Sequence, residues 1–451
     1  MSEQQPIFPC KFLPSDGRHC RLLGLYPQRQ NGLWMQRIKI LGGILTGDQW
    51  QALAELNRRY TPSVPLLLTT RQDIEFHNVS AEAVPLLQAD LARHGFSGLG
   101  ACGDTLRNIT VCPGSGLCDK TPDLIPFAWS LRKVLEQYEG IYSLPRKFKI
   151  SFSACPMACA QPWINDFGVI CSSSGQGEIN IQLIGAGSLG PRPQTGINIK
   201  EHGRAEDILP LALAAIRLFD KYGDRTNRNK ARLRHVRERV GDSEFMALLQ
   251  DELRNTSTTS IPVLPEISVP PLNLHHVIDL NLWYGGLSSD YAEAIAYIMR
   301  EENIIVRPQT HHRLSLFARD KDRARRVVLD NPVLAHLVNG PDVVSCPGTT
   351  YCARALVNTH AVEKAIREQV SECTQHAIRI SGCPNSCAQS AVADIGLIGK
   401  IRTDHSGRRR EGFSVVTGGG MGKTPMLARQ YMRFIAADEV PTVIKQLIAK
   451  G

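Results

Sequence analysis

The hydrophobic pattern of this chain describes the same order of elements twice. The apolar run at residues 38–41 ends in two glycines and is followed by a helix-periodic stretch, GDQWQALAELNRRY. The run at residues 280–284 likewise ends in two glycines, before SSDYAEAIAYIMREEN. A second apolar run follows each helix, from Val64 in the first copy and from Asn303 in the second. Both segments therefore predict strand, glycine turn, helix and strand.

The repeat continues into two pairs of cysteine loops. After a further helix come VCPGSGLC at residues 111–118 and SCPGTTYC at residues 345–352. ACPMACAQ at residues 154–161 and GCPNSCAQ at residues 382–389 follow, each between hydrophobic strands. Further on, INIQLIGAGSLG matches FSVVTGGGMG. The chain is therefore predicted to be an α+β protein, internally duplicated and with pseudo-twofold symmetry.

Length and composition narrow the class of protein. With 451 residues, the chain is long enough for two or three domains. Its start, MSEQQPIFPCKF, lacks a basic segment followed by an apolar one, and the longest apolar run, 208–219, contains Pro210 and Arg217. We therefore expect a cytoplasmic protein without a membrane partner. The net charge of +9 suits an acidic partner or a polyanionic ligand.

The thirteen cysteines indicate metal or cluster chemistry, because a cytosolic chain keeps its thiols reduced and does not use a disulfide framework. Each half contains a Cys-x5-Cys and a Cys-x3-Cys. The candidate ligands are Cys112, Cys118, Cys155 and Cys159 in the first half, and Cys346, Cys352, Cys383 and Cys387 in the second. Four thiolates from two loops suit a [4Fe-4S] cluster or a tetrahedral zinc. Zinc ribbons usually use Cys-x2-Cys, so the wider spacing favours iron-sulfur. Eight buried free cysteines are the remaining alternative, and the repeated spacing argues against it.

With these motifs the chain resembles the siroheme-containing sulfite and nitrite reductase family over nearly its whole length. The matching stretches include LTTRQDIEFHNV, DTLRNITVC, LPRKFKISFSAC, YGDRTNRNKARL and SGCPNSCAQSAVADIGLIGK. The resemblance implies siroheme and [4Fe-4S] as cofactors, with the second-half cysteines holding a cluster and Cys387 also bridging to the siroheme iron. It implies substrate-side catalytic cations at Arg71, Arg107, Lys147 and Lys149. It also implies that Arg225, Asn227, Arg228 and Arg232 lie near the siroheme carboxylates.

The chemistry of the residues agrees with this assignment. Sulfite and nitrite are anions whose reduction consumes protons, so their site needs fixed positive charge. In RKFKISF the strand period of two places Lys147 and Lys149 on one face, with Arg146 and Phe148 on the other. An alternating lysine strand is often a solvated edge, but this one runs through an apolar continuation straight into a cysteine loop. Both lysines are therefore expected to point into one cavity.

The resemblance also predicts a domain plan. Residues 20–103 and 272–340 are expected to be ferredoxin-like half-domains that pair into one domain. Residues 104–220 and 341–451 are expected to be the two cluster and siroheme-binding domains of a duplicated nitrite/sulfite reductase fold. Between them, residues 221–271 are expected to be a basic linker segment; its stretch from Lys221 to Arg239 carries eight Lys or Arg and two acids. Without interleaved aromatic residues this stretch does not predict a nucleic-acid partner.

A cysteine quartet in both halves is similar to the dissimilatory sulfite reductases, in which two related chains each keep a cluster. A second cluster on the first quartet is therefore expected, and a second siroheme on Cys159 stays open. The second half lacks a Lys-x-Lys strand and offers only His376 and Arg379. We therefore expect chemistry at Cys387 and a structural or electron-relaying role at Cys159. His311 and His312 are candidates to line a second haem face, although surface or core packing is the commoner role for histidine.

The predicted function is six-electron reduction of sulfite to sulfide, because sulfite-reducing members tend to carry Lys at both positions of the Lys-x-Lys strand. Reduction of nitrite to ammonia and oxygenation of a corrinoid precursor are alternatives within the family. A zinc protein or a nucleic-acid-binding protein is the rival outside it. Two glycine-rich stretches, GAGSLG and TGGGMGKT, lack the context of a nucleotide site. Electrons are therefore expected from a ferredoxin or a partner reductase.

Overall fold

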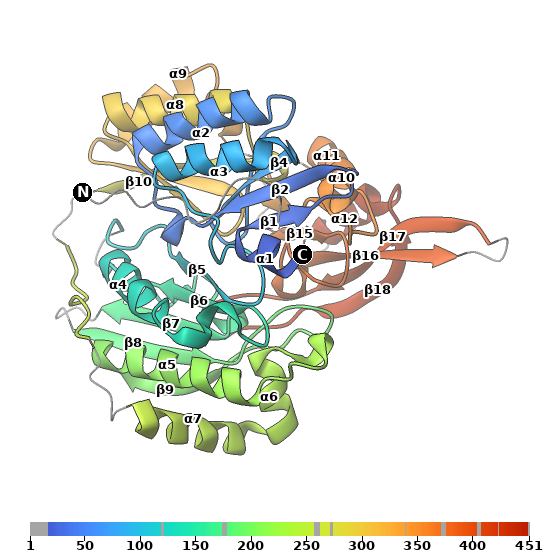
Figure 1. The fold of residues 1–451 in the computed structure, drawn as a ribbon. Helices are drawn as coiled ribbons and strands as arrows, with labels where there is room; N and C mark the ends of the chain where they lie inside the picture. Colours follow the sequence, from blue (N-terminus) through green and yellow to red (C-terminus); the bar gives the residue numbers. More distant parts are fainter. Residues whose placement is uncertain are drawn as a thin grey trace.

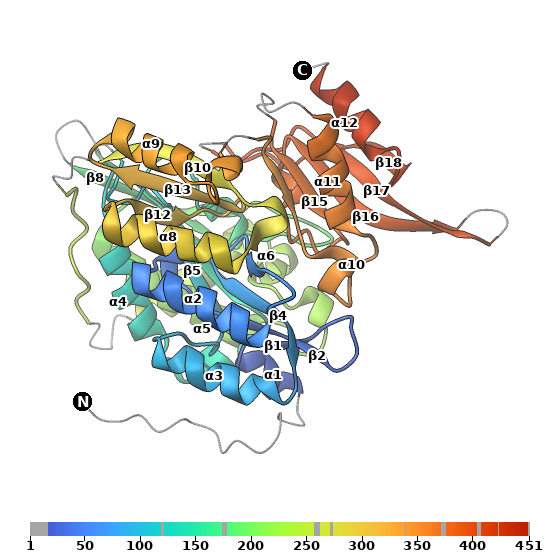
Figure 2. The same cartoon turned by 90° about the horizontal axis from the view of Figure 1, so that it is seen from above.

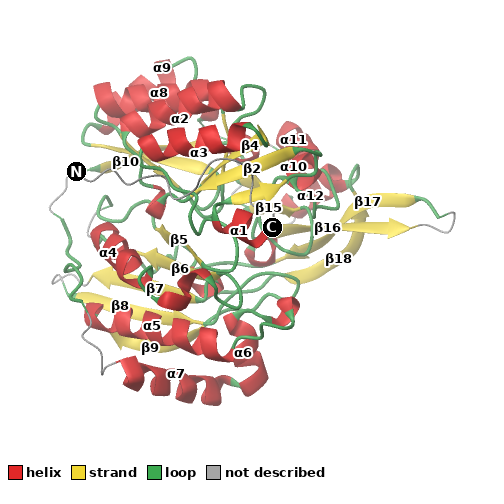
Figure 3. Cartoon of the chain, viewed as in Figure 1, coloured by secondary structure: helices red, strands yellow, loops and turns green. Residues whose placement is uncertain are grey.

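The computed structural model describes residues 17–118, 121–173, 178–256, 262–270, 274–338, 340–370, 376–403, 407–422 and 424–449. Within these ranges the chain forms two half-domains that pack together and two domains that each carry a cysteine quartet (Figure 1). The α+β fold class is confirmed. Colouring by secondary structure shows mixed sheets with helices packed against them (Figure 3).

The first half-domain holds one five-stranded sheet, in the order β1-β2-β4-β3-β11. Its elements are α1 (Gly17–Leu22), β1 (Leu25–Pro27), β2 (Leu33–Ile38), η1 (Leu41–Gly43), α2 (Gly47–Tyr60), β3 (Leu66–Leu68), β4 (Ile74–Ser80) and α3 (Ala83–Arg93). Thr46 starts α2 with a capping box, in which its side chain and that of Gln49 each accept from the other residue's backbone N–H. The glycine turn is needed at Gly42, whose φ is +59° and whose missing Cβ would lie 3.2 Å from Val111.

The second half-domain repeats this order around a three-stranded sheet, β10-β13-β12. Its elements are β10 (His275–Asn281), η5 (Trp283–Gly285), β11 (Gly286–Leu287), α8 (Ser289–Glu301), β12 (Ile305–Pro308), β13 (Arg313–Ala318), α9 (Lys321–Asp330) and η6 (Ala335–Leu337). β11 pairs antiparallel with β3 of the first half-domain, Gly286 opposite Leu67. The second half-domain therefore adds an edge strand to the sheet of the first.

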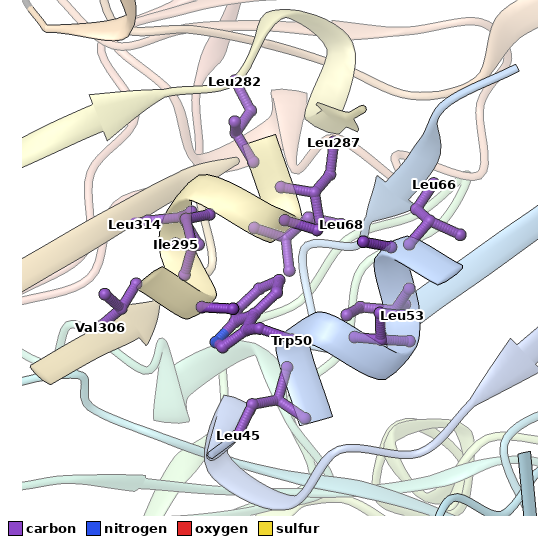
Figure 4. Packing of buried hydrophobic residues seen from close by; sticks show 14 of the residues in the cluster. Leu45, Trp50, Leu53, Leu66, Leu68, Leu282, Leu287, Ile295, Val306 and Leu314 are labelled. Atoms are coloured by element: carbon purple, nitrogen blue, oxygen red, sulfur yellow. The ribbon is translucent and has the colours of Figure 1, made fainter. Parts of the chain in front are cut away.

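One hydrophobic core joins the half-domains, and α2 and α8 pack side by side over it. Figure 4 shows Trp50 and Leu53 of α2 facing Ile295 of α8, with Leu68 and Leu287 between them. Trp50 is fully buried. Because both helices present their apolar faces to the same core, the half-domains form a single unit.

The first cysteine domain contains the sheet β5-β6-β7-β8-β9, in which β5, β6 and β7 are parallel and β8 and β9 antiparallel. Its elements are β5 (Leu106–Val111), α4 (Ile125–Leu135), η2 (Glu139–Tyr142), β6 (Phe148–Ser153), η3 (Pro162–Ile164), β7 (Phe167–Ser173), β8 (Ile179–Gly185), β9 (Ile197–Gly203) and α5 (Ala205–Tyr222).

The segment expected to be a basic linker is part of this domain's core. Residues 221–256 form η4 (Arg228–Lys230), α6 (Leu233–Val240) and α7 (Asp242–Thr256). Leu233 and Val236 of α6 and Phe245 and Leu249 of α7 are buried with the domain's other apolar side chains. The arginines of α6 alternate with these apolar positions at helical spacing, so the segment packs as an amphipathic layer on α5.

The second cysteine domain repeats the first with the sheet β14-β15-β16-β17-β18 and the same strand directions. Its elements are β14 (Val343–Ser345), α10 (Gly348–Tyr351), α11 (Thr359–Gln369), β15 (Ile378–Ser381), η7 (Ser390–Val392), β16 (Ile395–Thr403), β17 (Arg409–Thr417), β18 (Arg429–Ala436) and α12 (Val440–Ile448). In both domains the cysteine loops follow the carboxyl ends of neighbouring parallel strands, which brings them to one sheet edge.

Neither glycine-rich stretch leads into a helix. β8 ends at Gly185, the first residue of one stretch, and an isolated bridge then joins Ser188 to Gln194. An equivalent bridge joins Gly420 to Met426. Lys423 of the second stretch lies outside the described residues. Among the described residues, no helix combines the length and the apolar character that a membrane span requires.

Candidate active site

The first quartet is assembled from the loops after β5 and β6. The N–H of Cys112 donates to the carbonyl of Phe152 at 2.9 Å, which ties the two loops together. The thiols of Cys155 and Cys159 hydrogen-bond with that of Cys112 and, with burial, raise its pKa. Cys118 is exposed at the surface, and the partial burial of its thiol, followed by the charge of the nearby Cys155 thiolate, raises its pKa. Cys112, Cys155 and Cys159 are thus in hydrogen-bond contact, and Cys118 lies near enough to Cys155 for their charges to interact.

The second quartet repeats this arrangement in the loops after β14 and β15. The N–H of Cys346 donates to the carbonyl of Ile380 at 3.0 Å, the counterpart of the bond made by Cys112. Burial raises the pKa of Cys346 to about 12, and the charges of Cys387 and Cys352 add to this shift. Burial and the same two thiolates raise the pKa of Cys383. The second set of predicted ligands therefore also converges.

Each cysteine loop faces the half-domain of the other copy. Thr70, in the first half-domain, donates its hydroxyl to the carbonyl of Cys387 at 3.1 Å. Thr310, in the second half-domain, donates to the carbonyl of Cys159 at 3.2 Å. Each half-domain thus contacts the cysteine loop of the other copy. Arg71 directly follows Thr70, the residue that contacts the loop of the second quartet.

Lys147 and Lys149 enter the same region from the start of β6, and both are partly buried. Burial, followed by the charges of Arg232 and Arg107, lowers the pKa of Lys147 to about 7, while the Cys387 thiolate acts in the opposite direction. Burial, Lys147 and Arg71 lower the pKa of Lys149 well below its usual range. The two lysines therefore point together, as the strand period predicts, and the charge of each disfavours the charge of the other.

The two predicted arginines are held by backbone carbonyls. Arg71 donates to the side-chain oxygen of Asn165 at 2.7 Å, to the carbonyl of Ile150 at 3.1 Å and to that of Asn108, and burial lowers its pKa to about 10. Arg107 donates to the carbonyls of Ala101 at 2.6 Å and Gly103 at 3.2 Å. Carbonyl partners orient a guanidinium without neutralising it, so both arginines keep their charge for an anionic ligand.

Asp166 supports this group, and the sequence interpretation missed it. Its carboxylate is fully buried and accepts from the Arg232 guanidinium at 2.8 Å and from the N–H of Lys149 at 2.8 Å. Asp394 accepts from the N–H of Ala377 at 2.8 Å in the other copy. Both acids stand seven residues after the last cysteine of their quartets. That repeated spacing was the available signal.

Of the four residues expected near the siroheme carboxylates, the structure brings Arg232 alone into this cluster of cations. Arg225 is exposed, pairs with Asp220 and donates to the Ser143 carbonyl at 2.7 Å. Arg228 is exposed and pairs with Asp104, which also holds Arg146 at 2.8 Å. Asn227 is exposed and caps η4. These three residues are exposed and lie outside the buried group.

The equivalent region facing Cys159 has a different electrostatic character. Arg379 is paired with Asp342 at 2.8 Å, so its charge is balanced. Burial lowers the pKa of His311 to about 4, and the Gln161 amide lies 2.9 Å from its Nε2. Burial also lowers the pKa of His312 to about 3. With neutral histidines and a paired arginine, this region has less free positive charge than the Lys147 side.

The residues on the Lys147 side fit the two cofactors that the sequence predicts. Four cysteines from two loops are the ligand set of a [4Fe-4S] cluster. Among the cations on this side, the Nε atoms of Arg71 and Arg232 are buried and have no hydrogen-bond partner in the described chain. Buried cationic donors without partners suit a polycarboxylate macrocycle, because its carboxylates can satisfy them.

Comparison with protein families gives two matches that together cover most of the chain. The model described as "Nitrite and sulphite reductase 4Fe-4S domain" matches residues 102–257 and 341–449. The model described as "Nitrite/Sulfite reductase ferredoxin-like half domain" matches residues 26–94. The 4Fe-4S domain therefore occurs twice, once around each cysteine quartet.

Curated relatives match over nearly the full length. The assimilatory ferredoxin-dependent nitrite reductase of Haloferax mediterranei is 28% identical over 94% of this chain and 80% of its own. The ferredoxin–nitrite reductase of Leptolyngbya laminosa is 28% identical over 92% of this chain and 86% of its own. The solved structure of the Mycobacterium tuberculosis NirA protein has a TM-score of 0.81 at 20% identity and covers 96% of this chain and 86% of its own. That likeness establishes the fold.

Proposed function

Because this chain belongs to the family of nitrite and sulfite reductases, we propose that it reduces nitrite to ammonia with electrons from ferredoxin. The observation that carries this proposal is the set of full-length relatives, which are named ferredoxin-dependent nitrite reductases. Each turnover would consume one nitrite, six electrons and eight protons and release one ammonium and two waters. Sulfite reduction, the main sequence prediction, is not confirmed by these relatives and stays a prediction.

The enzyme is an oxidoreductase that works with siroheme and a [4Fe-4S] cluster. We assign the cluster to Cys346, Cys352, Cys383 and Cys387, and a second cluster to the quartet of the first half. Siroheme supplies an iron that can bind a small anion and a conjugated ring that can accept electrons from a neighbouring cluster. Arg232 would hold its carboxylates from the buried side, supported by Asp166.

The charges of the site support a monoanionic substrate. Burial and the charge of Lys147 lower the pKa of Lys149, and the pKa of Lys147 is about 7, so the two ammonium forms disfavour each other. A bound anion favours the ammonium forms and so draws protons into the site. Nitrite needs one such charge, whereas the sulfite dianion needs two. Lys147 can then pass a proton to the reacting oxygens, because its pKa of about 7 lies near the working pH.

Sulfite remains the second candidate because of one residue. Lys149 gives the strand a second amine, which the sequence resemblance associates with sulfite-reducing members. A dianion can stabilise both ammonium forms at once, which offsets the mutual repulsion that lowers the pKa of Lys149. The charge of Lys149 is thus the feature by which the site would favour one substrate over the other.

The experiment that tests the proposal is a substrate comparison on anaerobically prepared, fully cofactor-loaded protein. Methyl viologen should be reduced electrochemically, because dithionite releases sulfite. We expect a higher kcat/KM for nitrite than for sulfite, with six viologen radicals oxidised for each ammonium formed. A higher kcat/KM for sulfite would transfer the assignment to the second candidate, and turnover of neither anion would overturn both.

A further inference from the structure

The hairpin of β16 and β17 carries a concentration of positive charge. From Lys400 to Gly412 the sequence has five Lys or Arg and two acids, Asp404 and Glu411. Arg402, Arg408, Arg409 and Arg410 are all exposed. We use the name basic hairpin for the described strand ends, residues 400–403 and 408–412. Figures 1 and 2 show this hairpin extending away from the body of the molecule.

The hairpin places like charges opposite each other. Arg402 pairs across the strands with Arg410, and Thr403 pairs with Arg409. Like charges at directly opposed positions destabilise a sheet, so this arrangement is costly for the isolated protein. Asp438 lies 3.6 Å from Arg410, but both side chains are largely exposed, so this ion pair offsets little of the repulsion. An acidic partner would remove the repulsion.

The duplicated first half serves as an internal comparison. There the equivalent hairpin joins β7 and β8, and its outermost described pair is Ser173 with Ile179. Its residues 171–180 contain Glu178 and neither Lys nor Arg. β16 has nine residues against seven in β7, so the second-half hairpin is both longer and basic. The extension belongs to one copy alone, which argues against a general requirement of the fold.

The basic hairpin starts beside the second quartet. β14, β15 and β16 are parallel, so β16 runs toward the sheet edge that carries Cys346 and Cys383. Ser381 pairs with Ile398, and a Cβ on Gly399 would lie 2.5 Å from the carbonyl oxygen of Gly382. Gly382 directly precedes Cys383. A further exposed cation, Arg354, stands two residues after Cys352.

We propose that the basic hairpin, together with Arg354, is the docking surface for an acidic electron-donor protein. This inference rests on the proposed function, because it supplies the contact through which the donor reaches the second quartet. In each encounter the reduced donor would lose one electron and the cluster held by Cys346, Cys352, Cys383 and Cys387 would gain it. Six encounters would supply one nitrite.

Charge complementarity is the physical basis for choosing such a donor. A surface of clustered arginines attracts an acidic protein at long range and raises the association rate by 10- to 1,000-fold at low salt. Placement beside the ligand loop favours a redox protein over a nucleic acid, which gains nothing from proximity to a cluster. The protruding shape allows the donor to contact the hairpin and the cysteine loop together.

The test compares two charge-reversal variants of the cofactor-loaded full chain. R402E/R410E changes the hairpin, and R325E/R326E makes the same charge change on exposed positions of α9. The donor is a reduced plant-type [2Fe-2S] ferredoxin at low salt, with viologen-driven nitrite reduction measured in parallel. We expect R402E/R410E to lose at least about tenfold in ferredoxin-driven kcat/KM and to keep its viologen-driven rate within about twofold.

The outcomes separate this inference from the proposed function. The control variant should keep its ferredoxin-driven rate, and oxidised ferredoxin should bind R402E/R410E at least about tenfold more weakly than wild type by calorimetry. Equal ferredoxin-driven rates in wild type and R402E/R410E would overturn the docking surface. So would a loss of binding to a 30-base-pair DNA without a change in ferredoxin kinetics, which would assign the hairpin to nucleic acid. Failure of wild type to turn over nitrite with viologen would count against the proposed function itself.

Discussion

Lys149 is the residue at which the two candidate substrates should differ most. Burial and the charge of Lys147 already lower its pKa, so charging this side chain costs more than charging an ordinary lysine. Nitrite can bind without charging it, whereas the sulfite dianion gains from a second ammonium. One such contact is worth up to about 4 kcal/mol at an effective dielectric near 20, before desolvation offsets most of it. We therefore expect Lys149→Asn to lower kcat/KM for sulfite by about tenfold to a hundredfold and for nitrite by less.

The matched control for this change is Lys133→Asn, at an exposed position of α4 outside the cluster of cations. It should leave both substrates unaffected. An equal loss for nitrite and sulfite in Lys149→Asn would contradict the role assigned to its charge.

Lys147 predicts how activity depends on pH. With a pKa of about 7, its ammonium form dominates below pH 7 and its neutral form above it. Nitrite stays an anion throughout this range, so kcat/KM should fall as pH rises through 7, approaching tenfold per pH unit while Lys147 dominates binding. The charged groups that shape this titration are Arg107, Arg146, Arg232, Lys149 and Cys387.

Lys147→Arg checks this explanation, because a guanidinium remains charged across the same range. The variant should show a flatter pH profile of kcat/KM than wild type, whatever its absolute rate. Lys133→Arg should keep the wild-type profile. A decline above pH 7 that persists unchanged in Lys147→Arg would place the titrating group elsewhere.

At the scale of elements, the two Cys-Pro-Gly loops differ in how they use their glycines. A Cβ on Gly114 would lie 2.4 Å from the sulfur of Cys118, so an added methyl group forces that ligand away. Gly348 has a φ of +54°, and its Cβ would lie 2.2 Å from the Thr359 hydroxyl. The first loop thus needs glycine to leave room for the sulfur of Cys118. The second needs glycine for its positive φ and to leave room for the first residue of α11, Thr359.

Gly114→Ala should therefore remove the first cluster while the second remains. We expect non-haem iron and acid-labile sulfide to fall from about eight to about four atoms per chain, with the siroheme absorption retained. Gly420→Ala is the control, because nothing lies within 4 Å of its added Cβ. Unchanged iron in Gly114→Ala would contradict the assignment of a cluster to the first quartet.

At the scale of the whole molecule, the half-domain of each copy contacts the cysteine loop of the other copy. Thr70 of the first half-domain contacts the Cys387 loop, and Thr310 of the second contacts the Cys159 loop. The site at Cys387 therefore combines cations from the first copy with thiolates from the second. A half chain could hold neither site complete. Duplication also allowed the two sites to diverge, with free cations facing Cys387 and a paired Arg379 facing Cys159.

This asymmetry predicts different consequences for equivalent cysteines. Fully loaded wild type should contain about eight non-haem irons per chain in addition to siroheme iron. Cys387→Ser should lose the siroheme or uncouple it, together with activity, whereas Cys159→Ser should keep appreciable viologen-driven activity. Four non-haem irons in fully loaded wild-type protein would contradict the presence of two clusters, and equal, complete losses in both variants would contradict the division of roles.

The sequence by itself determined the duplication and the α+β class, and it predicted both cysteine quartets. These properties are local: periodicity within 10 to 15 residues sets helices and strands, and ligand spacing within one loop is written directly in the chain. The Lys147 and Lys149 face followed from the strand period in the same way. Residues 221–256 of the expected linker were misjudged, because the eight cations from Lys221 to Arg239 hid an apolar helical face that only packing on α5 makes evident.

The tertiary structure alone decided how these parts meet. Arg232 pairs with Asp166, which lies 66 positions earlier in the chain. Arg225 pairs with Asp220 and Arg228 with Asp104, and both arginines are exposed. Burial of Lys147 and Lys149 beside other cations, which sets their pKa values, depends on side chains from several segments. The sequence shows which residues are charged. The interaction energies of these charges, and hence their pKa values, depend on the distances between them and on their burial, which are fixed only when distant segments pack together.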